Sequence, residues 1–431
     1  MPLPLRRALS AAVSSVRLRR ALSTAAPHPP WAMIHHARLV RSPALRSSLL
    51  LADPPSASHL FVPSHLVNPR LHPDAGGETV GIHGGMVRAT SGDGLLLLQF
   101  VDGTDVSKVR EDEDEDGEYF RRYMDPDITR FVCNPVSGEL FRLPDIDGTR
   151  KVPLPWHPNG ILTHSARGHG PPDRYAVAEL SLNHDAEEPS FVMRRFLSET
   201  GEWEKLVGLP SPLPLPLRMN MDHEVLAFGG RLWWVDLTWG AISADPFSDR
   251  PELRFVELPR DNVMPLPGTD QTAAQSMCRR IGVSEGRLRY FELSRKEHKE
   301  PSFLLSSFVL DDEGSGWTME SQLACRQVWG GEGGKDMPRI GVIDPLNASV
   351  AYLLIGNHSL AVDMENRKVL GRSLIHEVDE VEGPNSFVFS AFIKPCVLPP
   401  WLESSLIPSA GKKEVAGNNA TADILVCASR D

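Results

Sequence analysis

Length, composition and charge limit what this protein can be. The chain has 431 residues, of which 41% are hydrophobic and 23% are charged, enough for one large repeat domain or two ordinary domains. Its formal net charge is -11, and an acidic body repels phosphate backbones, so nucleic acid is not an expected partner.

Residues 1–26 have the composition of an organelle-targeting leader. They carry five arginines among alanines, serines and leucines, and the first acidic residue of the chain is Asp53. Such an amphipathic, acid-free segment predicts import, and its arginine content favours the mitochondrion over the chloroplast. The second copy of Arg-Arg-Ala-Leu-Ser predicts cleavage between Leu22 and Ser23. The alternatives are a secretory signal, or a basic tail without targeting function on a protein of the cytosol or nucleus.

Beyond the leader, the chain alternates short apolar runs with turn residues. The 37 prolines and 34 glycines suit many tight connections, and no long segment shows the 3.6-residue period of an amphipathic helix. The strands predicted from runs of β-favouring residues are 94–101, 231–237, 286–293, 302–310 and 386–393. The body is therefore predicted to be all-β, and no run is long enough for a membrane span.

A local phrase recurs along this body. A strand ends, a polar turn with glycine follows, and a tryptophan opens the next strand, at 196–203 and again at 309–317. Residues 131–140 also join an apolar run to a polar turn with glycine, and Arg142-Leu-Pro144 follows them. The run 256–259 ends in Leu-Pro in the same way. Hairpins of this kind, with aromatic residues between sheets, are typical of propeller blades. We expect a β-propeller-like fold of repeated antiparallel meanders, with a pair of β-sandwiches as the alternative.

Several of these strings, in this order, resemble one protein family. They are Ala52–Ser58, Asn134-Pro135, Leu232–Leu237 with Gly240 and Asp245, Ile281–Leu288, and Trp317 after its acidic turn. Together they resemble the domain-of-unknown-function family numbered 1618, over roughly residues 31–400. The resemblance implies a plant source and a propeller-like fold related to the domains that follow F-boxes. It implies no known activity.

An F-box of its own is not expected in this chain. The region between Trp31 and Leu51 lacks the length and the helical pattern of an F-box. We interpret 31–35 and 48–52 as the first strands of the domain instead. A substrate receptor without a recognisable F-box stays an alternative function.

No motif in the chain predicts a catalytic, cofactor or metal site. The five cysteines are scattered without a CxxC pair, and we expect them to be reduced and mostly buried. His157, His164, His169 and Asp173 fit no metal-ligand spacing, and the acidic run 111–116 lacks the glycine of a calcium loop. We expect Asp222-His223-Glu224 to form a turn before the strand 225–228.

Two further segments are predicted to be irregular. The proline-rich run 209–217 is expected to be an extended connection between sheets. The small and polar residues 409–431 are expected to form a flexible tail.

The expected function is a non-enzymatic scaffold or recognition module that binds a protein partner through loops at one end of the fold. Trp234 and Trp239 are the candidate anchors, although core packing is the favoured interpretation of both. The competing hypothesis is an enzyme with a polar site in the central channel, where histidines and carboxylates would converge. The sequence leaves the partner and the oligomeric state open.

Overall fold

The computed structural model describes the body of the chain. The described residues are 28–68, 82–102, 127–149, 158–168, 170–183, 186, 190–213, 219, 224–259, 277–296, 302–314, 316–329, 338–375 and 393–409. The predicted leader with Leu22 and Ser23, the acidic run 111–116, most of the strand predicted at 386–393, and residues 410–431 of the predicted tail lie outside them.

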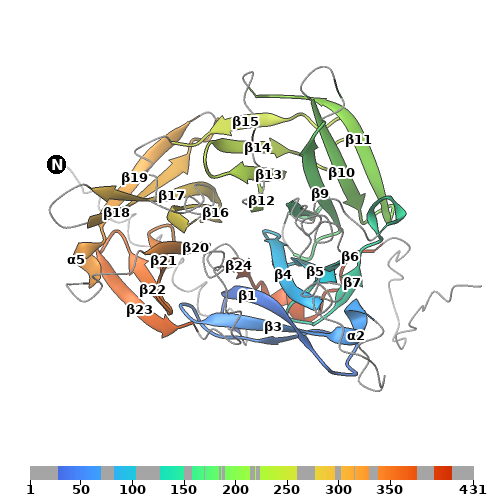
Figure 1. The fold of residues 1–431 in the computed structure, drawn as a ribbon, viewed down its shortest axis with the longest axis horizontal. Coiled ribbons are helices and arrows are strands. Elements are labelled where there is room, and N and C mark those ends of the chain that lie inside the picture. The colour runs from blue at the N-terminus through green and yellow to red at the C-terminus, as the bar shows by residue number, and fades with distance from the viewer. Residues whose placement is uncertain are drawn as a thin grey trace, which may run out of the picture.

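Strands dominate the described chain, which confirms the all-β prediction. Four sheets each contain four antiparallel strands in chain order, and each sheet runs from the centre of the molecule to its circumference (Figure 1). Their strands are β8 (Asn159–His164), β9 (Arg174–Leu182), β10 (Ser190–Leu197) and β11 (Glu202–Pro210); β12 (Glu224–Phe228), β13 (Arg231–Asp236), β14 (Gly240–Ala244) and β15 (Arg254–Glu257); β16 (Arg279–Ser284), β17 (Arg287–Lys296), β18 (Ser302–Leu310) and β19 (Trp317–Ala324); and β20 (Arg339–Ile343), β21 (Val350–Ile355), β22 (His358–Asp363) and β23 (Lys368–Leu374).

The fifth sheet has eight strands and contains two four-stranded units. Its strands are β1 (Trp31–Val40), β2 (Ser48–Leu50), β3 (Ala57–Pro63), β4 (Ile82–Thr90), β5 (Leu96–Asp102), β6 (Asp127–Cys133), β7 (Leu140–Arg142) and β24 (Lys394–Val397). Strands β4 to β7 form another antiparallel meander, whereas β24, β1, β3 and β2 form the sixth unit. A short pairing of β1 with β4, at His36 and Ala37, joins the two units into one sheet.

The ring of six units is closed by strands from opposite ends of the described chain. Strand β24 pairs antiparallel with the first half of β1, from Trp31 opposite Val397 to Ile34 opposite Lys394. The rest of β1 pairs in parallel with β3. Such closure is one way in which a ring of sheets avoids an open edge at its seam. The described chain is therefore β-propeller-like, as the sequence predicts.

The predicted strands coincide with observed ones. The runs 94–101, 231–237, 286–293 and 302–310 form β5, β13, β17 and β18, and the predicted first strands form β1 and β2. They are strands because short runs of leucine, valine and aromatic residues alternate with turn residues, several of them glycine.

The recurring tryptophan phrase forms hairpins with a shared contact. Phe196 pairs with Trp203 across β10 and β11, and Leu310 pairs with Trp317 across β18 and β19. The Trp203 indole N–H donates to the Pro144 carbonyl at 2.8 Å, and that of Trp317 donates to the Glu257 carbonyl at 2.9 Å. Each acceptor belongs to the preceding sheet or to the segment that follows it. The repeated tryptophan therefore ties neighbouring sheets together near the circumference.

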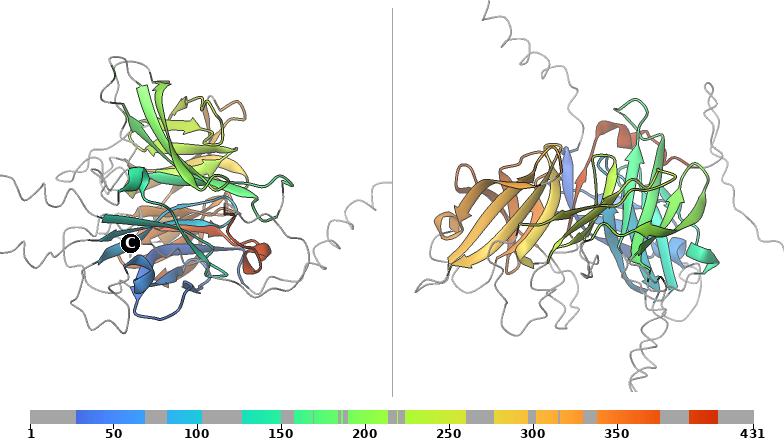
Figure 2. Two further views of the ribbon diagram at one scale, coloured as in Figure 1. Left: turned by 90° about the vertical axis from the view of Figure 1, so that its right-hand side faces the viewer. Right: turned by 90° about the horizontal axis from the view of Figure 1, so that it is seen from above.

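Apolar cores fill the spaces between neighbouring sheets. One cluster joins Phe191 and Ala178 of one sheet to Trp234 and Ile242 of the next. The sheets approach so closely there that a Cβ on Gly160 of β8 would lie 2.4 Å from Val225 Cγ1. The side views show the twisted sheets standing side by side around the ring (Figure 2).

Helices are minor in the described residues. The α-helices are α2 (Ser64–Val67) and α5 (Arg326–Trp329), with 3₁₀ turns at Ile146–Gly148 and Pro400–Glu403. In the described parts of the chain, no helix has the length and hydrophobicity needed to cross a membrane.

Candidate functional site

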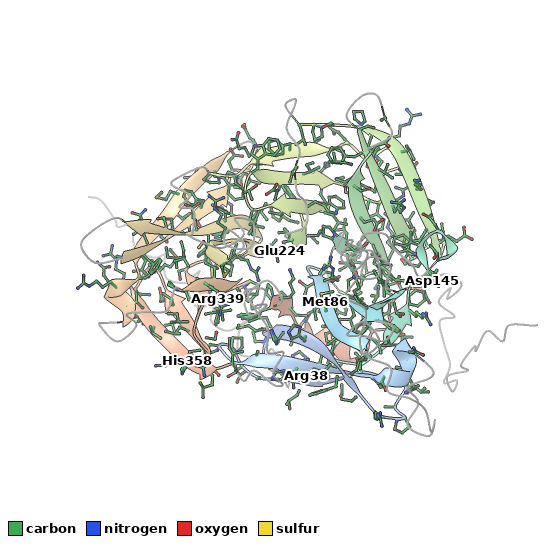
Figure 3. The ribbon with its side chains drawn as sticks, viewed as in Figure 1. Arg38, Met86, Asp145, Glu224, Arg339 and His358 are labelled. Carbon is green, nitrogen blue, oxygen red and sulfur yellow. The ribbon has the colours of Figure 1, made fainter. Side chains whose placement is uncertain are left out.

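A cavity of about 300 Å³ lies where the inner strands of the ring converge. Its walls come from β12, β16, β20 and β24, together with the turn after β4. Glu224, at the start of β12, points toward the centre of the ring (Figure 3). Leu346 also lines the cavity and is 46% exposed, which places the opening beside the turn between β20 and β21. We refer to this space as the central cavity.

Three buried charged side chains meet at the central cavity. The Lys394 ammonium of β24 lies 2.6 Å from Glu224 Oε1, and Arg280 Nη1 of β16 lies 3.8 Å from Glu224 Oε2. Arg280 also donates to the Ile393 carbonyl at 3.0 Å. Each of the three residues is at most 8% exposed. Since a buried charge is costly unless it is paired, this cluster fixes three inner strands relative to one another.

The environment of Lys394 disfavours its charged form. Burial lowers the pKa of Lys394, and repulsion from Arg280 and Arg88 lowers it further, whereas the attraction of Glu224 opposes the shift. An additional negative charge in the cavity would support the ammonium form. The protonation state of Lys394 is therefore sensitive to what occupies the cavity.

A second buried ion pair lies directly beside this cluster. Arg279 and Glu292 face each other across β16 and β17, with Nε and Oε2 3.5 Å apart. The Tyr290 hydroxyl donates to Glu292 at 2.7 Å, and Arg279 donates to the Leu237 carbonyl at 2.6 Å. Burial raises the pKa of Tyr290 well above its usual value, so the phenol stays a donor. Through Arg279, this pair links the sheet of β16 to β19 with the turn that follows β13.

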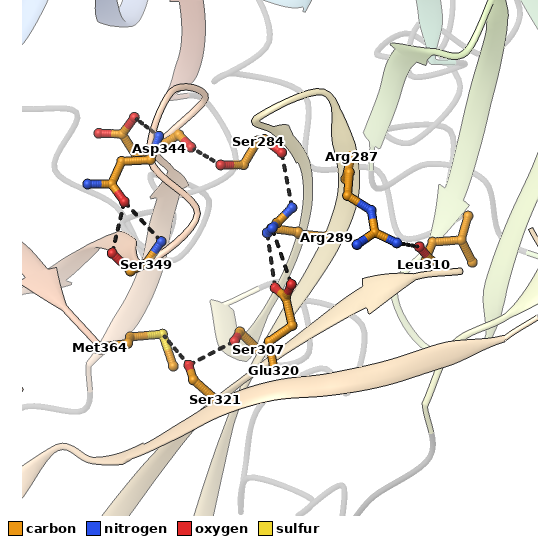
Figure 4. A network of polar contacts seen from close by, with 11 residues as sticks. Ser284, Arg287, Arg289, Ser307, Leu310, Glu320, Ser321, Asp344, Ser349 and Met364 are labelled. Carbon is orange, nitrogen blue, oxygen red and sulfur yellow. Dashed lines mark hydrogen bonds and ion pairs between the residues drawn. The ribbon is translucent and has the colours of Figure 1, made fainter. Parts of the chain in front are cut away.

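Hydrogen bonds between two turns hold the mouth of the cavity. The Ser284 hydroxyl donates to the Asp344 carbonyl at 2.5 Å, and the Glu285 N–H donates to the Pro345 carbonyl at 2.9 Å. The carboxylate of Asp344 caps its own turn by accepting from Leu346 N–H at 2.8 Å. In the same network, Arg289 donates to the Ser284 carbonyl and pairs with Glu320 (Figure 4). The entrance is therefore built from braced turns.

Of the described residues considered from sequence as acid–base or metal candidates, Glu224 alone lies at this cavity. Glu224 was expected in a turn but opens strand β12 and is buried; Asp222 and His223 lie outside the described residues. His164 ends β8 and lies next to Asp173, which donates its N–H to the His164 carbonyl at 2.9 Å, while His157 and His169 are not described. Among its described lining residues, the cavity has one carboxylate and no histidine.

Both candidate tryptophan anchors lie in the core. Trp234 is fully buried, and Trp239 is 9% exposed with its ring 4.9 Å from that of Phe255. Both side chains pack in the core of the structure, which was the favoured interpretation from sequence. Neither side chain is available to a partner on the surface.

The described cysteines behave as small buried hydrophobic residues. Cys133, Cys325 and Cys396 are buried and Cys278 is partly buried, all as free thiols. Burial raises the pKa of Cys133 and Cys325 to about 12, so neither is a ready thiolate. Within the described segments, no group of histidine, cysteine and acidic side chains is placed to hold a metal ion.

The outer strand β23 carries a second candidate site. Its side chains alternate between exposed and half-buried, and Lys368, Leu370, Arg372 and Leu374 share the exposed set. We call these four residues the β23 face. Leu370 and Leu374 are 51% and 49% exposed. Among the described strands, β23 is the one with two exposed large hydrophobic residues.

A groove of about 610 Å³ adjoins the β23 face. Arg372 and Leu374 line it on one side, and His59 of β3 and His358 of β22 line it as well. The turn before β3 is attached to β23 by a 2.8 Å hydrogen bond between the hydroxyls of Ser56 and Ser373. The groove, which we call the rim groove, therefore lies where β22 and β23 meet β3 and the turn before it.

The fold and these sites define a propeller-like protein with an ion-paired centre and an amphipathic patch at its circumference. Residues 234–357 match the model of the family described as "Protein of unknown function (DUF1618)". The match confirms the family resemblance on β13 to β21. No curated protein matches the chain.

Some solved structures resemble this fold distantly. AztD from Citrobacter koseri is 11% identical, with a TM-score of 0.28 and coverage of 70% of this chain and 76% of that one. A protein of unknown function from Dyadobacter fermentans is 10% identical, with a TM-score of 0.31 and coverage of 75% and 84%. The mannose phosphorylase MPT-4 from Leishmania mexicana is 10% identical, with a TM-score of 0.24 and coverage of 85% and 100%. Similarities this low carry no argument about function.

Proposed function

We propose that this protein is a non-enzymatic recognition module that binds a protein partner through the β23 face and the rim groove. The observation that carries the proposal is the alternation of Lys368, Leu370, Arg372 and Leu374 on one exposed strand. Exposed leucines that stand together on a rigid sheet are typical of an interaction surface. The six-unit ring supplies the rigid support.

Charge indicates the chemistry of the partner surface. The β23 face alternates two cations with two leucines, whereas the chain as a whole carries a net charge of -11. A partner segment with carboxylates between apolar side chains would complement this face and would be repelled by most of the remaining surface. We therefore propose an acidic, apolar segment as the partner's contact region.

Other outer strands offer a matched comparison for the test. Val207 on β11 is 60% exposed and Met319 on β19 is 47% exposed, but each is the one large exposed hydrophobic residue of its strand. Replacing these two residues by glutamate alters the surface as much as replacing Leu370 and Leu374 does. The control therefore separates a specific site from general surface charge.

Proximity labelling in plant cells, followed by mass spectrometry of the neighbours, tests the proposal. The doubly substituted chain Leu370→Glu with Leu374→Glu is expected to lose a neighbour that the unmodified chain and the Val207→Glu with Met319→Glu control both retain. If both double variants keep the same neighbours, the β23 face is not the binding surface.

We further propose that the partner is met inside an organelle, most simply the mitochondrion. The support is the arginine-rich, acid-free composition of residues 1–26. The same labelling experiment with a chain that begins at Thr24 tests import. We expect the full-length chain to label matrix proteins and the shortened chain to label cytosolic proteins. Identical neighbours for the two chains would refute import.

A further inference from the structure

We propose that the central cavity binds a small organic monocarboxylate, with its carboxylate beside Lys394 and Arg280 and its apolar body against the walls from β12, β16 and β20. This site is separate from the β23 face, which lies at the circumference of the ring. It adds a small-molecule ligand to a protein proposed to recognise a protein partner.

The shape and the walls of the cavity indicate an apolar ligand body. A volume of about 300 Å³ lies at the lower end of the range of small-molecule sites. Val225, Ile281, Val283, Val342 and Ile343 line it, so most of the wall is aliphatic. An aliphatic chain would gain from leaving water here, and a fully hydrated ion would not.

The charged end of the cavity indicates a negative head group. Lys394 and Arg280 both belong to the lining, and both are almost fully buried. In such a site of low dielectric, a carboxylate gains strongly from two cations and from charge-assisted hydrogen bonds. Glu224 already shows this pairing, because its carboxylate lies 2.6 Å from the Lys394 ammonium. A ligand carboxylate would share Lys394 with Glu224.

The opening is suited to a small ligand. Leu346 is both exposed and part of the lining, so one end of the cavity faces solvent. The turns around it are braced by the bonds from Ser284 and Glu285 to Asp344 and Pro345. Entry therefore needs no large rearrangement of the sheets, and a preformed site keeps the entropic cost of binding low.

Calorimetric titration of the full chain with hexanoate is the direct test, with hexanol, hexylammonium and inorganic phosphate as comparison probes. We expect saturable binding of hexanoate, weaker binding of butyrate, and no binding of hexanol or hexylammonium. Phosphate that binds as tightly as hexanoate would overturn the choice of an apolar acid. No heat from hexanoate at any concentration up to solubility would overturn the site itself.

Two substitutions with opposite expected signs make the test specific. Lys394→Met removes the ammonium but keeps an unbranched side chain one atom shorter, and is expected to weaken hexanoate binding by roughly tenfold or more. Glu224→Gln removes the competing carboxylate and is expected to strengthen hexanoate binding. Lys368→Met on the β23 face is the control and should leave the affinity unchanged. If Lys394→Met does not fold, Glu224→Gln decides: equal or weaker binding in that variant contradicts the proposal.

Discussion

Trp203 and Trp317 show how single side chains join the sheets of this ring. Each follows a hairpin turn, and each donates its indole N–H to a backbone carbonyl that belongs to, or follows, the outer strand of the preceding sheet. Both contacts lie near the circumference of the ring. The sheets diverge there and share less apolar contact than near the centre. The hydrogen bond supplies a directional link in that region.

We expect Trp317→Phe to lower the free energy of unfolding by about 1 kcal/mol or more, because a hydrogen bond is lost and packing against Tyr290 is reduced. Urea unfolding measures this change. Trp401→Phe is the control, since Trp401 is partly buried and has no indole hydrogen bond within the described residues. Equal losses in the two variants would show that ring size alone matters.

His35 and His36 on β1 make stability depend on pH. Burial lowers the pKa of His35 to about 2 and that of His36 to about 4, with further repulsion from neighbouring cationic groups. In the unfolded chain both titrate near 6.5. Between pH 6.5 and pH 4 the unfolded state therefore binds protons that the folded state does not. The contribution of these two histidines to stability therefore falls as pH falls through this window.

Each histidine is expected to contribute up to about 1.4 kcal/mol of lost stability per pH unit below pH 6. The contribution of His36 stops growing below its folded pKa of about 4. Urea midpoints measured from pH 7 to pH 4 give the slope. His36→Gln should make the dependence of stability on pH less steep. Any loss of packing caused by the substitution should lower stability by the same amount at every pH, including pH 7. A variant curve parallel to that of the unmodified chain would contradict the assignment.

The charged centre shows what sequence cannot reveal at the scale of residues. Glu224 and Lys394 are 170 residues apart, and nothing in either local pattern indicates a pair. The one signal is chemical: Lys394 is the single charged residue of the segment Ile393 to Val397. An ionisable residue within such a segment implies a buried partner, but it does not say which one.

At the scale of elements, local sequence specified the meanders well. Strands β13, β17 and β18 combine β-favouring residues with glycine turns, and their register follows from short hairpins. Strand β1 is different. Its first residues were predicted as a strand, but its parallel pairing with β3 and its bond with β24 depend on residues far apart in the chain. Local turn sequences, which predict hairpins, do not predict pairings between strands so far apart in the chain.

Close packing between elements gives a prediction at Gly160. An added methyl group on β8 would overlap Val225 of β12 and approach Leu232 of β13. We expect Gly160→Ala to destabilise the protein by about 1–3 kcal/mol, as overpacked cores do. Gly92→Ala is the control, because a Cβ there meets nothing within 4 Å. Adding Val225→Ala should recover part of the loss, and complete additivity of the two changes would rule out the contact.

At the scale of the whole molecule, closure by β24 is expected to control cooperativity. Trp31 and Met33 of β1 are buried in a cluster with Ile393 and residues of β20 and β21. A chain that ends at residue 392 loses β24 and exposes this seam, so it should no longer unfold in a single sharp transition. A chain that ends at Ser409 is the control and should unfold like the full chain. Equal cooperativity in both would show that the seam is not essential.

The pairing of Trp31 with Val397 also bears on biosynthesis. While a ribosome makes this protein, its first strand emerges long before the strand that completes the last unit. The nascent chain therefore stays an open array of sheets until synthesis is nearly finished. An open array can still be unravelled and threaded through a narrow pore, whereas a closed ring resists it. Late closure would therefore give the import proposed above a time window before the chain becomes a rigid body.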